Sequence, residues 1–375
     1  MKIIHFSDTH LGHGDYTAID PESELNQREI DIYKVFREII DYIIEAKPDL
    51  VIHAGDLFDN IRPSNKAISE ALEQFARLSK ADIPTVIIAG NHSTPRQRSK
   101  ETIFKILDYF ENIYPIYGGK YKKIIIGDCA IHAIPHTYSD QDLEENVRIA
   151  KPDKNYEYNI LVTHGVIRGI KEASWGEFKE QTIPDNILHS DFDYIALGHL
   201  HSCQEISKNA YYSGSPERLS FNEANQKKYF LEINLKTKSV RKIPTNTREM
   251  KVFDSIDCEK LTPEQVIESI QSRLENQTEG KIIRMTFDNI PRHVYSSLDH
   301  QKIHELTKNS THFEPVFHFK DEDSTGGSST SIIGTLDEEF ETFLKKKEIT
   351  GKEFTELRTL GLEYLGRIEE EVNIE

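Results

Sequence analysis

Short apolar runs alternate with longer amphipathic segments over the first part of the chain. The runs Ile3–Phe6, Leu50–Ala54 and Thr85–Ala89 have the length and the β-branched content of buried strands. Between them, apolar residues recur at helical spacing over Ser23–Ala46 and over Ser64–Ser79. This alternation predicts a βαβαβ arrangement with a parallel sheet.

After Tyr114 the pattern changes to short strands separated by turns. The further strands that it predicts are Lys122–Ile126, Ala130–Ile134, Ile160–Val162, Tyr194–Leu197, Ala210–Ser213 and Lys228–Asn234. Together with the first part of the chain, these runs favour an α/β fold in which a mixed sandwich of two sheets is flanked by helices.

A smaller α/β unit is expected from residue 248 to residue 319. Met250–Ile256, Lys281–Phe287 and Phe313–Phe319 have the pattern of strands, with a helix between the last two. Thr262 followed by Pro263 is typical of a helix start, because threonine caps the first turn and proline suits the first helical position.

The last part of the chain has the composition of a tether followed by a helical pair. Residues 320–335 are rich in serine, glycine, threonine and acidic residues, which predicts a flexible linker. Residues 336–375 carry apolar stripes at helical spacing, but two short helices cannot bury a stable core alone. They are expected to dock either on their own protein or on a partner, and the linker favours a partner.

Length, charge and cysteine content bound the class of protein. A chain of 375 residues is expected to form two domains, and its formal net charge of −17 argues against a generally basic nucleic-acid-binding surface while leaving room for a local basic groove. The three cysteines show no CxxC pattern, as expected of reduced thiols. No signal peptide precedes the first strand and no apolar run has membrane-spanning length, so a cytoplasmic protein is expected.

Five short segments supply the candidate chemistry, and most of them follow a predicted strand. They are Asp8-Thr9-His10, Gly55-Asp56, Gly90-Asn91-His92, Thr163-His164-Gly165 and Gly198-His199-Leu200-His201. Loops at one edge of a sheet can bring such residues together, and the set offers ligands for two divalent metals. Mixed oxygen and nitrogen ligands suit Mn²⁺, Fe²⁺ or Zn²⁺ better than Ca²⁺ or Mg²⁺. The absence of cysteine from the set argues against a structural zinc site.

The spacing within the segments suggests individual roles. Asp8 and His10 are two residues apart, so both can face one metal. Asp56 can bridge two cations with its two oxygens, and Asn91 adds a neutral carbonyl oxygen. His92 is the imidazole left over, and it could protonate a leaving oxygen as general acid. Taken singly, each histidine is more often structural; we interpret His5 and His53 as core residues, and His13, His132, His136 and His189 have no motif.

The order of these motifs resembles that of the calcineurin-like metallophosphoesterases. Two blocks, Gly55–Asp59 with Arg62-Pro63-Ser64 and Ser213–Phe221, further resemble SbcD-type DNA double-strand-break repair nucleases. The resemblance covers residues 1–235 and implies a four-layer α/β/β/α sandwich over 1–247. By position and layout, 248–319 resembles the DNA-capping domain of that family, and 336–375 resembles the segment that binds an SbcC-type, SMC-like ATPase.

The resemblance also implies a site and an activity. Its metals, usually manganese, would be held by Asp8, His10, Asp56 and His201 on one side and by Asp56, Asn91, His164 and His199 on the other, with His92 as catalytic acid. The implied activity is that of a 3′→5′ exonuclease on duplex DNA and an endonuclease on single strands or hairpins. Such a nuclease would act as a homodimer with two ATPase subunits, in the cytoplasm or at the nucleoid of a cell, or as a phage-encoded protein in its host.

One position departs from the family pattern, and several basic residues are candidates for substrate contacts. Ser93 stands where the family usually has aspartate, which could alter the rate and the metal preference. The candidates for phosphate contacts, unless they are simply solvated surface, are Arg62, Arg96, Arg98, Arg218, Lys66, Lys100, Lys120, Lys122 and Lys123.

Two other functions compete with the nuclease. The first is a phosphoesterase that acts on a small phosphodiester or a phosphoprotein, and the second is a non-catalytic scaffold for the ATPase and DNA. The block centred on Arg218 and the tethered helical pair argue against the first. A complete ligand set together with His92 argues against the second, because a scaffold does not need a metal site.

Overall fold

The computed structural model describes residues 1–16, 18–21, 23–95, 97, 100–169, 181–274, 278–320 and 357. The chain divides into two compact units, 1–320 and 321–375. The predicted linker beyond Lys320 and the predicted helical pair over 336–375 lie outside the described residues, except for Leu357. Within the described ranges, no helix is both long enough and apolar enough to cross a membrane.

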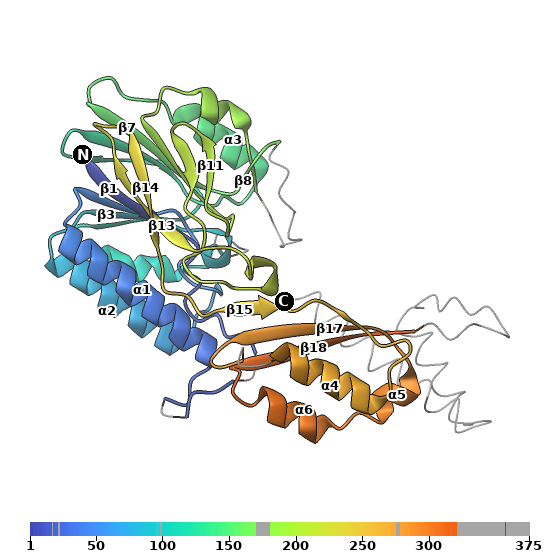
Figure 1. The fold of residues 1–375 in the computed structure, drawn as a ribbon. Coiled ribbons are helices and arrows are strands. Elements are labelled where there is room, and N and C mark those ends of the chain that lie inside the picture. Colours follow the sequence, from blue (N-terminus) through green and yellow to red (C-terminus); the bar gives the residue numbers. More distant parts are fainter. Residues whose placement is uncertain are drawn as a thin grey trace. The chain divides into compact units, whose positions relative to one another are not determined.

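The first sheet contains the predicted βαβαβ arrangement, which is confirmed (Figure 1). Its strand order is β14-β13-β1-β2-β3-β4, and β1 to β4 are parallel. The strands are β1 Lys2–Phe6, β2 Leu50–His53, β3 Thr85–Ile88, β4 Ile113–Ile116, β13 Tyr229–Asn234 and β14 Ser239–Pro244. One face of this sheet packs on α1 (Gln27–Ala46) and α2 (Asn65–Lys80) through a cluster that includes Phe6, Phe36 and Phe75.

The start of α1 lies four residues beyond its predicted position. Ser23 belongs to a turn instead, where its backbone N–H and its hydroxyl both donate to Asp20. The residue that caps the helix is Asn26, whose side chain accepts from the N–H of Arg28. In α2, by contrast, Ser64 is the N-cap and accepts from the N–H of Ala67, as its place at the predicted start suggests.

The second sheet packs against the other face of the first. Its strand order is β11-β12-β10-β7-β6-β5. The strands are β5 Lys122–Ile126, β6 Cys129–Ile134, β7 Tyr158–His164, β10 Tyr194–Gly198, β11 Gln204–Ser207 and β12 Ala210–Tyr212. Ile52 of the first sheet and Val162 of the second belong to the apolar cluster between the two sheets. The outer face of the second sheet is covered by α3 (Asp140–Ile149), so the predicted four-layer α/β/β/α sandwich is confirmed (Figure 1).

Short elements complete this part of the chain. They are the two-stranded pair β8 Val166–Ile167 and β9 Thr182–Ile183 and the 3₁₀ helices η1 Asn91–Ser93, η2 Ile103–Tyr109, η3 Asp185–His189 and η4 Phe221–Glu223. Of these, η1 and η4 carry residues of the candidate site that is described below.

Residues from Met250 onward form a separate parallel sheet with helices. The elements are β15 Met250–Val252, β16 Ile256–Asp257, β17 Ile282–Ile290, β18 His312–Phe319, α4 Pro263–Leu274, α5 Arg292–Ser296 and α6 His300–Thr307. The single strand that was predicted over Met250–Ile256 is wrong: β15 and β16 pair with successive stretches of β17. Four steps along the chain from Val252 to Ile256 face only three along β17, so one extra residue interrupts the ladder.

Candidate metal centre

The candidate ligands lie at the carboxyl ends of parallel strands in both sheets. Asp8, Asp56 and Asn91 follow β1, β2 and β3, whereas His164 ends β7 and His199 follows β10. The two edges meet directly, because His164 Nδ1 lies 2.9 Å from the carbonyl oxygen of Ala54. The fold therefore brings together loops that are far apart in the sequence.

The predicted ligands form two groups. Asp8, His10 and His201 can place one ligand atom each within 4.8 Å of one another, and so can Asp56, His164 and His199. Asn91 joins the second group, because its Oδ1 lies 3.0 Å from His164 Nε2 and 3.3 Å from His199 Nδ1. The structure thus brings all seven predicted ligand residues together in two groups, with Asp56 in the second group alone; their role as metal ligands stays a prediction.

Four of these residues adopt a backbone conformation that is unusual for side chains other than glycine. The φ angles are 54° at Asp8, 45° at His10, 51° at Asp56 and 103° at His199. Such conformations cost free energy and are held only where the surrounding structure enforces them, which is common at functional sites. Here the enforcement includes a ladder of backbone hydrogen bonds, such as that from Asp8 N–H to Gly55 O at 2.9 Å.

Two glycines allow the close approach of the ligand side chains. A Cβ at Gly55 would lie 2.2 Å from His164 Nδ1, and one at Gly90 would lie 2.2 Å from Asp56 Oδ1. Gly55 also has a φ of +107°, which L side chains rarely adopt. The glycines of the Gly-Asp and Gly-Asn-His motifs therefore have a steric reason at this site.

The carboxylates and imidazoles perturb one another strongly. Burial raises the pKa of Asp8, against the opposing effect of the nearby histidines His164 and His201. Burial would also raise the pKa of Asp56, but the charge and hydrogen bond of His164, whose Nε2 lies 3.0 Å from Asp56 Oδ2, hold it well below its usual range. Conversely, burial would lower the pKa of His164, but Asp56 raises it.

The donor chemistry fits a pair of divalent cations. The set combines carboxylate oxygens, one amide oxygen and imidazole nitrogens, which Mn²⁺, Fe²⁺ and Zn²⁺ accept. Both ring nitrogens of His10 are buried and lack a hydrogen-bond partner among the described residues. A buried imidazole with no such partner is costly, and a metal ligated by one of its nitrogens would remove part of that cost.

Asp59 is a neighbour of the site that the motif analysis did not assign. Its Oδ1 lies 3.2 Å from His10 Nδ1, although out of line for a hydrogen bond, and 3.1 Å from His13 Nδ1. Burial would lower the pKa of His13, but its contacts with Asp15 and Asp59 raise it to about 9. The block Gly55–Asp59 contained the signal for Asp59, whereas no sequence signal identified His13.

His92 lies at the entrance of the site. Its backbone N–H donates to Asp56 Oδ1 at 3.0 Å, and its Nδ1 lies 2.5 Å from the carbonyl oxygen of Asp59. Its ring centre is 4.9 Å from that of His10. His92, His10 and His201 all line a cavity of about 540 Å³, so the predicted acid faces the space that a substrate would enter.

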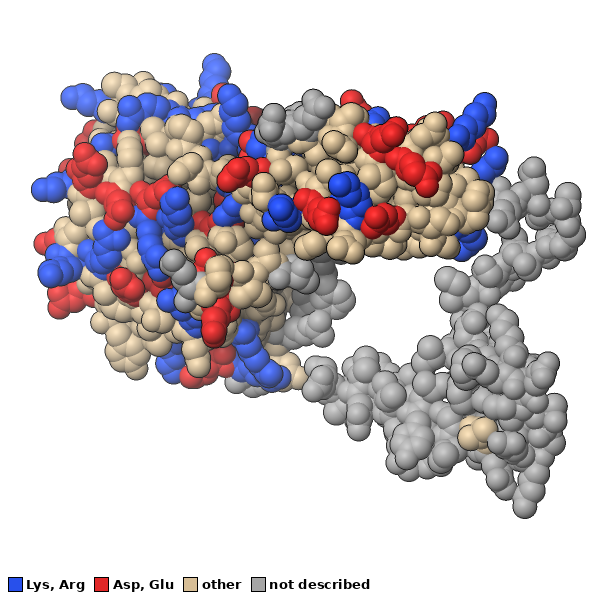
Figure 2. All heavy atoms as spheres, turned by 60° about the horizontal axis from the view of Figure 1, so that its bottom comes forward, with Lys and Arg blue, Asp and Glu red and all other residues tan. Residues whose placement is uncertain are grey.

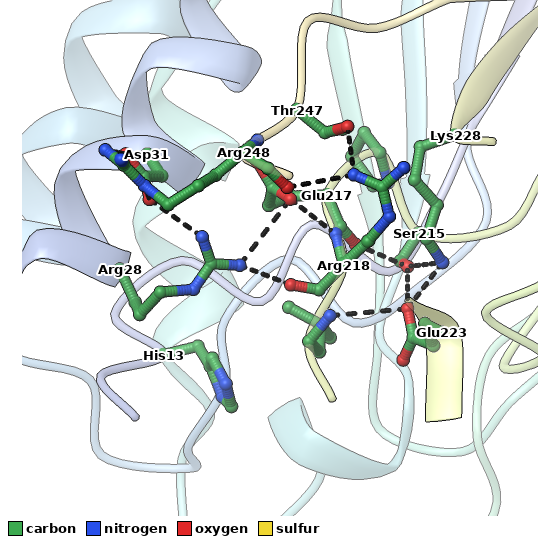
Figure 3. A network of polar contacts seen from close by, with 12 residues as sticks. His13, Arg28, Asp31, Ser215, Glu217, Arg218, Glu223, Lys228, Thr247 and Arg248 are labelled. Carbon is green, nitrogen blue, oxygen red and sulfur yellow. Dashed lines mark hydrogen bonds and ion pairs between the residues drawn. The ribbon is translucent and has the colours of Figure 1, made fainter. Parts of the chain in front are cut away.

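A buried polar network that contains Glu223, Lys228 and Ser215 (Figure 3) also contacts His201. His201 Nδ1 lies 3.0 Å from Glu223 Oε1, and Lys228 contacts the other oxygen of the same carboxylate. Burial would raise the pKa of Glu223, but the hydrogen bond from His201 and the charge of Lys228 lower it to about 2. The motif analysis missed both Glu223 and Lys228, because isolated charged residues in the sequence indicate solvated surface.

The structure places the predicted substrate-contact residues in different surroundings. Arg62 is exposed, and Arg96 and Arg98 lie outside the described residues. Arg218 does not contact the cavity: its guanidinium donates to Gln226 O, Thr247 Oγ1 and Arg248 O at 3.1, 2.6 and 2.9 Å (Figure 3). These bonds give Arg218 a structural role, because they hold the chain segment that leads to β15; a substrate contact at Arg218 stays a prediction.

The remaining basic candidates lie on the surface. Lys66, Lys100, Lys120 and Lys122 are exposed, and the Nζ of Lys123 is 2.8 Å from Asp153. On the face drawn in Figure 2, lysine and arginine side chains are interspersed with acidic ones. Ser93, at the position that departs from the family pattern, is buried, and its hydroxyl has no hydrogen-bond partner among the described residues.

Comparisons with known proteins agree with this geometry. The chain is similar to the DNA double-strand break repair protein Mre11 of Methanococcus maripaludis, with 34% identity over 61% of this chain and 60% of that protein. It is also similar to the Mre11 proteins of Sulfolobus acidocaldarius, with 29% identity over 75% of this chain and 72% of that protein, and of Sulfurisphaera tokodaii, with 36% identity over 54% and 49%. The chain thus spans about 60% of the length of the first of these relatives.

Residues 1–203, which contain every one of the seven ligand candidates, match the calcineurin-like phosphoesterase family. This match covers more than half of the chain and includes the strands from β1 to β10 and the helices α1, α2 and α3. Divalent metal ions are therefore implied at the two groups of ligand residues. The chain belongs to the calcineurin-like phosphoesterase family.

Proposed function

We propose that this protein is a manganese-dependent DNA nuclease that processes double-strand breaks. The observation that carries the proposal is the convergence of two groups of carboxylate and imidazole residues, of which His10 and His201 line a cavity that His92 also lines. The similarity to Mre11 proteins, whose name states a role in double-strand break repair, supports DNA as the substrate.

The proposed ligands divide between two Mn²⁺ ions. Asp8, His10, Asp56 and His201 would hold one ion, and Asp56, Asn91, His164 and His199 would hold the other. When bound, a pair of divalent ions lowers the pKa of a water nucleophile and neutralises charge on the phosphoryl oxygens. Asp56 is the proposed bridging carboxylate because it belongs to the second group and also lies beside the segment after β1, where His10 N–H donates to its carbonyl oxygen at 3.1 Å.

His92 is proposed to deliver a proton to the departing oxygen of the cleaved phosphodiester. The contact of its Nδ1 with the carbonyl oxygen of Asp59 fixes the plane of the ring, and its backbone N–H is tied to Asp56. A positioned imidazole is worth on the order of 10²–10⁴-fold in rate. His92 can therefore be removed with a large effect on catalysis while the ligand side chains stay in place.

The assembly is proposed by the same reasoning. The α/β unit over 248–319 would act as a DNA-capping domain beside the nuclease domain over 1–247, and residues 336–375, beyond a linker over 320–335, would bind an SbcC-type ATPase. The exposed basic residues, with Arg62 foremost because it follows the Gly-Asp segment, would contact phosphates. A homodimer with two ATPase subunits, working inside the cell, would be the active form.

The test is cleavage of end-labelled linear duplex and hairpin DNA with Mn²⁺, by the full chain and by His92→Gln. We expect shortening of the duplex that chelation abolishes, and a loss of at least a hundredfold in His92→Gln with Mn²⁺ binding unchanged. His189→Gln is the matched control, because His189 is an exposed histidine of η3.

Two outcomes would contradict the proposal. If the full chain, with and without an SbcC-type ATPase, leaves DNA intact but cleaves bis-p-nitrophenyl phosphate, a small-substrate phosphoesterase replaces the nuclease. If it cleaves neither and binds no Mn²⁺, yet still binds DNA and the ATPase, the protein is a scaffold.

A chain truncated after residue 335 should lose capture of the ATPase and keep its Mn²⁺ binding.

A further inference from the structure

The polar network behind His201 has a composition that packing alone does not require. Glu223 ends the short η4 helix, and Lys228 immediately precedes β13; both are almost fully buried. Their side chains meet at 2.5 Å, so the fold has placed an ion pair in its interior. Burying two charges costs several kcal/mol per ion before their attraction offsets it, so such a pair is weak support for stability alone.

The polar atoms of this ion pair form hydrogen bonds with His201 and with Ser215. Glu223 Oε1 accepts from His201 Nδ1 at 3.0 Å, while its Oε2 also lies 3.3 Å from Ser215 Oγ. Lys228 Nζ donates to the carbonyl oxygen of His201 at 2.9 Å and to Ser215 Oγ at 2.9 Å. The ring and the backbone of His201 are therefore both held by the same ion pair.

This arrangement has a consequence for the chemistry of the imidazole. A carboxylate that accepts from Nδ1 keeps the proton on that nitrogen and leaves Nε2 as the nitrogen that can bind a metal together with Asp8 and His10. His201 lies at the edge of its group and is partly exposed, whereas Asp8 and His10 are buried. It is the member of that group with the least packing to fix its ring, so it depends most on a polar support.

We propose that Glu223 and Lys228 are positioning residues that fix the ring orientation of His201 for metal binding. The inference rests on the proposed function, because it takes His201 to be a metal ligand. Glu223 sets the tautomer and the tilt of the imidazole, and Lys228 locks Glu223 and the backbone of His201 at the same time. Glu223 lines the same cavity as His201, but its carboxylate oxygens are bonded to His201, Ser215 and Lys228, so both residues act through His201.

The experiment is a titration of the full chain with Mn²⁺ in the absence of substrate. Calorimetry and electron paramagnetic resonance both measure the binding. Glu223→Gln keeps the size of the side chain but removes the charge, and Glu223→Gln with Lys228→Met removes both charges, so that no buried lysine is left unpaired. Glu232→Gln is the control, because Glu232 on β13 pairs with Lys2 and Arg241 and belongs to neither group of candidate ligands. Thermal unfolding of each variant shows whether it is folded.

We expect the wild-type chain and the control to bind two Mn²⁺ ions. In the folded variants one of the two sites should lose 10- to 100-fold in affinity, as is typical when a hydrogen-bonded partner of a metal ligand is removed, and the other should be unchanged. Wild-type affinity at both sites in the double variant would overturn the inference while leaving the proposed function standing. A wild-type chain that binds no Mn²⁺ would instead overturn the proposed function itself, and the inference with it.

Discussion

Loss of Arg248 should loosen the α/β part over 248–319, and the contacts of Arg248 allow the magnitude of the effect to be worked out. Its guanidinium makes two bonds to Asp31 on α1, from Nε to Oδ2 at 2.5 Å and from Nη2 to Oδ1 at 2.6 Å. The remaining nitrogen, Nη1, donates to Gly280 O at 2.6 Å and Thr311 Oγ1 at 2.9 Å. One side chain thus ties the first α/β layers to the turn before β17 and to the residue before β18.

The magnitude follows from burial and from what remains after the change. The side chains of Arg248 and Asp31 are 20% and 10% exposed, so the pair is largely desolvated. Truncating one partner of a buried pair costs about 3–5 kcal/mol. Asp31 keeps its contact with Arg28 at 2.7 Å, however, and methionine keeps the apolar stem, so Arg248→Met should cost about 2–3 kcal/mol.

The matched control is Arg241→Met, which removes an arginine from an exposed pair. Arg241 Nη2 lies 2.7 Å from Glu232 Oε1, but the arginine side chain is 63% exposed. Exposed pairs contribute less than about 1 kcal/mol, so this variant should be nearly as stable as the wild type. The comparison separates the loss of a buried bridge from the loss of an arginine as such.

Native-state hydrogen exchange is the suitable assay, because it reports the opening free energy of each segment without assuming a single unfolding transition. The amides of β17 should lose about 2–3 kcal/mol of protection in Arg248→Met, as inferred above for the buried pair. Those of β2, deep in the sandwich, should change much less. Equal protection of β17 in Arg248→Met and Arg241→Met would refute the view that the contact between Arg248 and Asp31 stabilises the α/β part over 248–319.

Three further predictions concern the interior of the sandwich. Gly90→Ala would place a methyl group 2.2 Å from Asp56 Oδ1, so calorimetry should find Mn²⁺ affinity reduced at least about tenfold. Burial lowers the pKa of His5 and of His53 to about 3, below the unfolded value of 6.5, so stability is fully present above pH 6.5 and is lost as the pH falls toward 3. Between pH 6.5 and 4.5 each histidine should remove roughly 2–3 kcal/mol, and urea unfolding of His5→Gln should show a smaller loss than the wild type. Ser93→Ala removes a buried hydroxyl without a partner among the described residues, so its melting temperature should equal or exceed that of the wild type; a clear drop would reveal a partner.

The βαβαβ arrangement and the convergence of the candidate ligand residues were predictable because both depend on short-range patterns. A buried parallel strand is an apolar run of fixed length, and the residue after it lies at the sheet edge whatever the rest of the chain does. Asp8, Asp56 and Asn91 follow such runs directly, so their convergence needed only the parallel order of β1, β2 and β3. The four-layer arrangement came from the family resemblance, since periodicity alone does not say how two sheets stack.

The parts that were missed depend on contacts between distant segments. Arg218 reads as a free cation in its motif, yet its donors bind the carbonyl oxygens of Gln226 and Arg248. Glu223 and Lys228 are ordinary surface residues until the chain places them behind His201. The helix α3 was also missed, since only Leu143 and Asn146 of its ten residues are buried and its apolar stripe is correspondingly weak.

The candidate ligand residues at positive φ and the close contacts at Gly55 and Gly90 together indicate that the site is formed before any cation binds. Holding Asp8, His10 and Asp56 at positive φ costs of order 1–3 kcal/mol per residue, which only the completed fold can offset. The offset includes two parallel segments that bond to each other, with His10 N–H to Asp56 O at 3.1 Å and Leu11 N–H to Leu57 O at 2.8 Å. These bonds use backbone groups alone, so they do not depend on a bound ion. Cation binding is then expected to add stability by mass action on a formed cage rather than to fold the loops that carry the ligands.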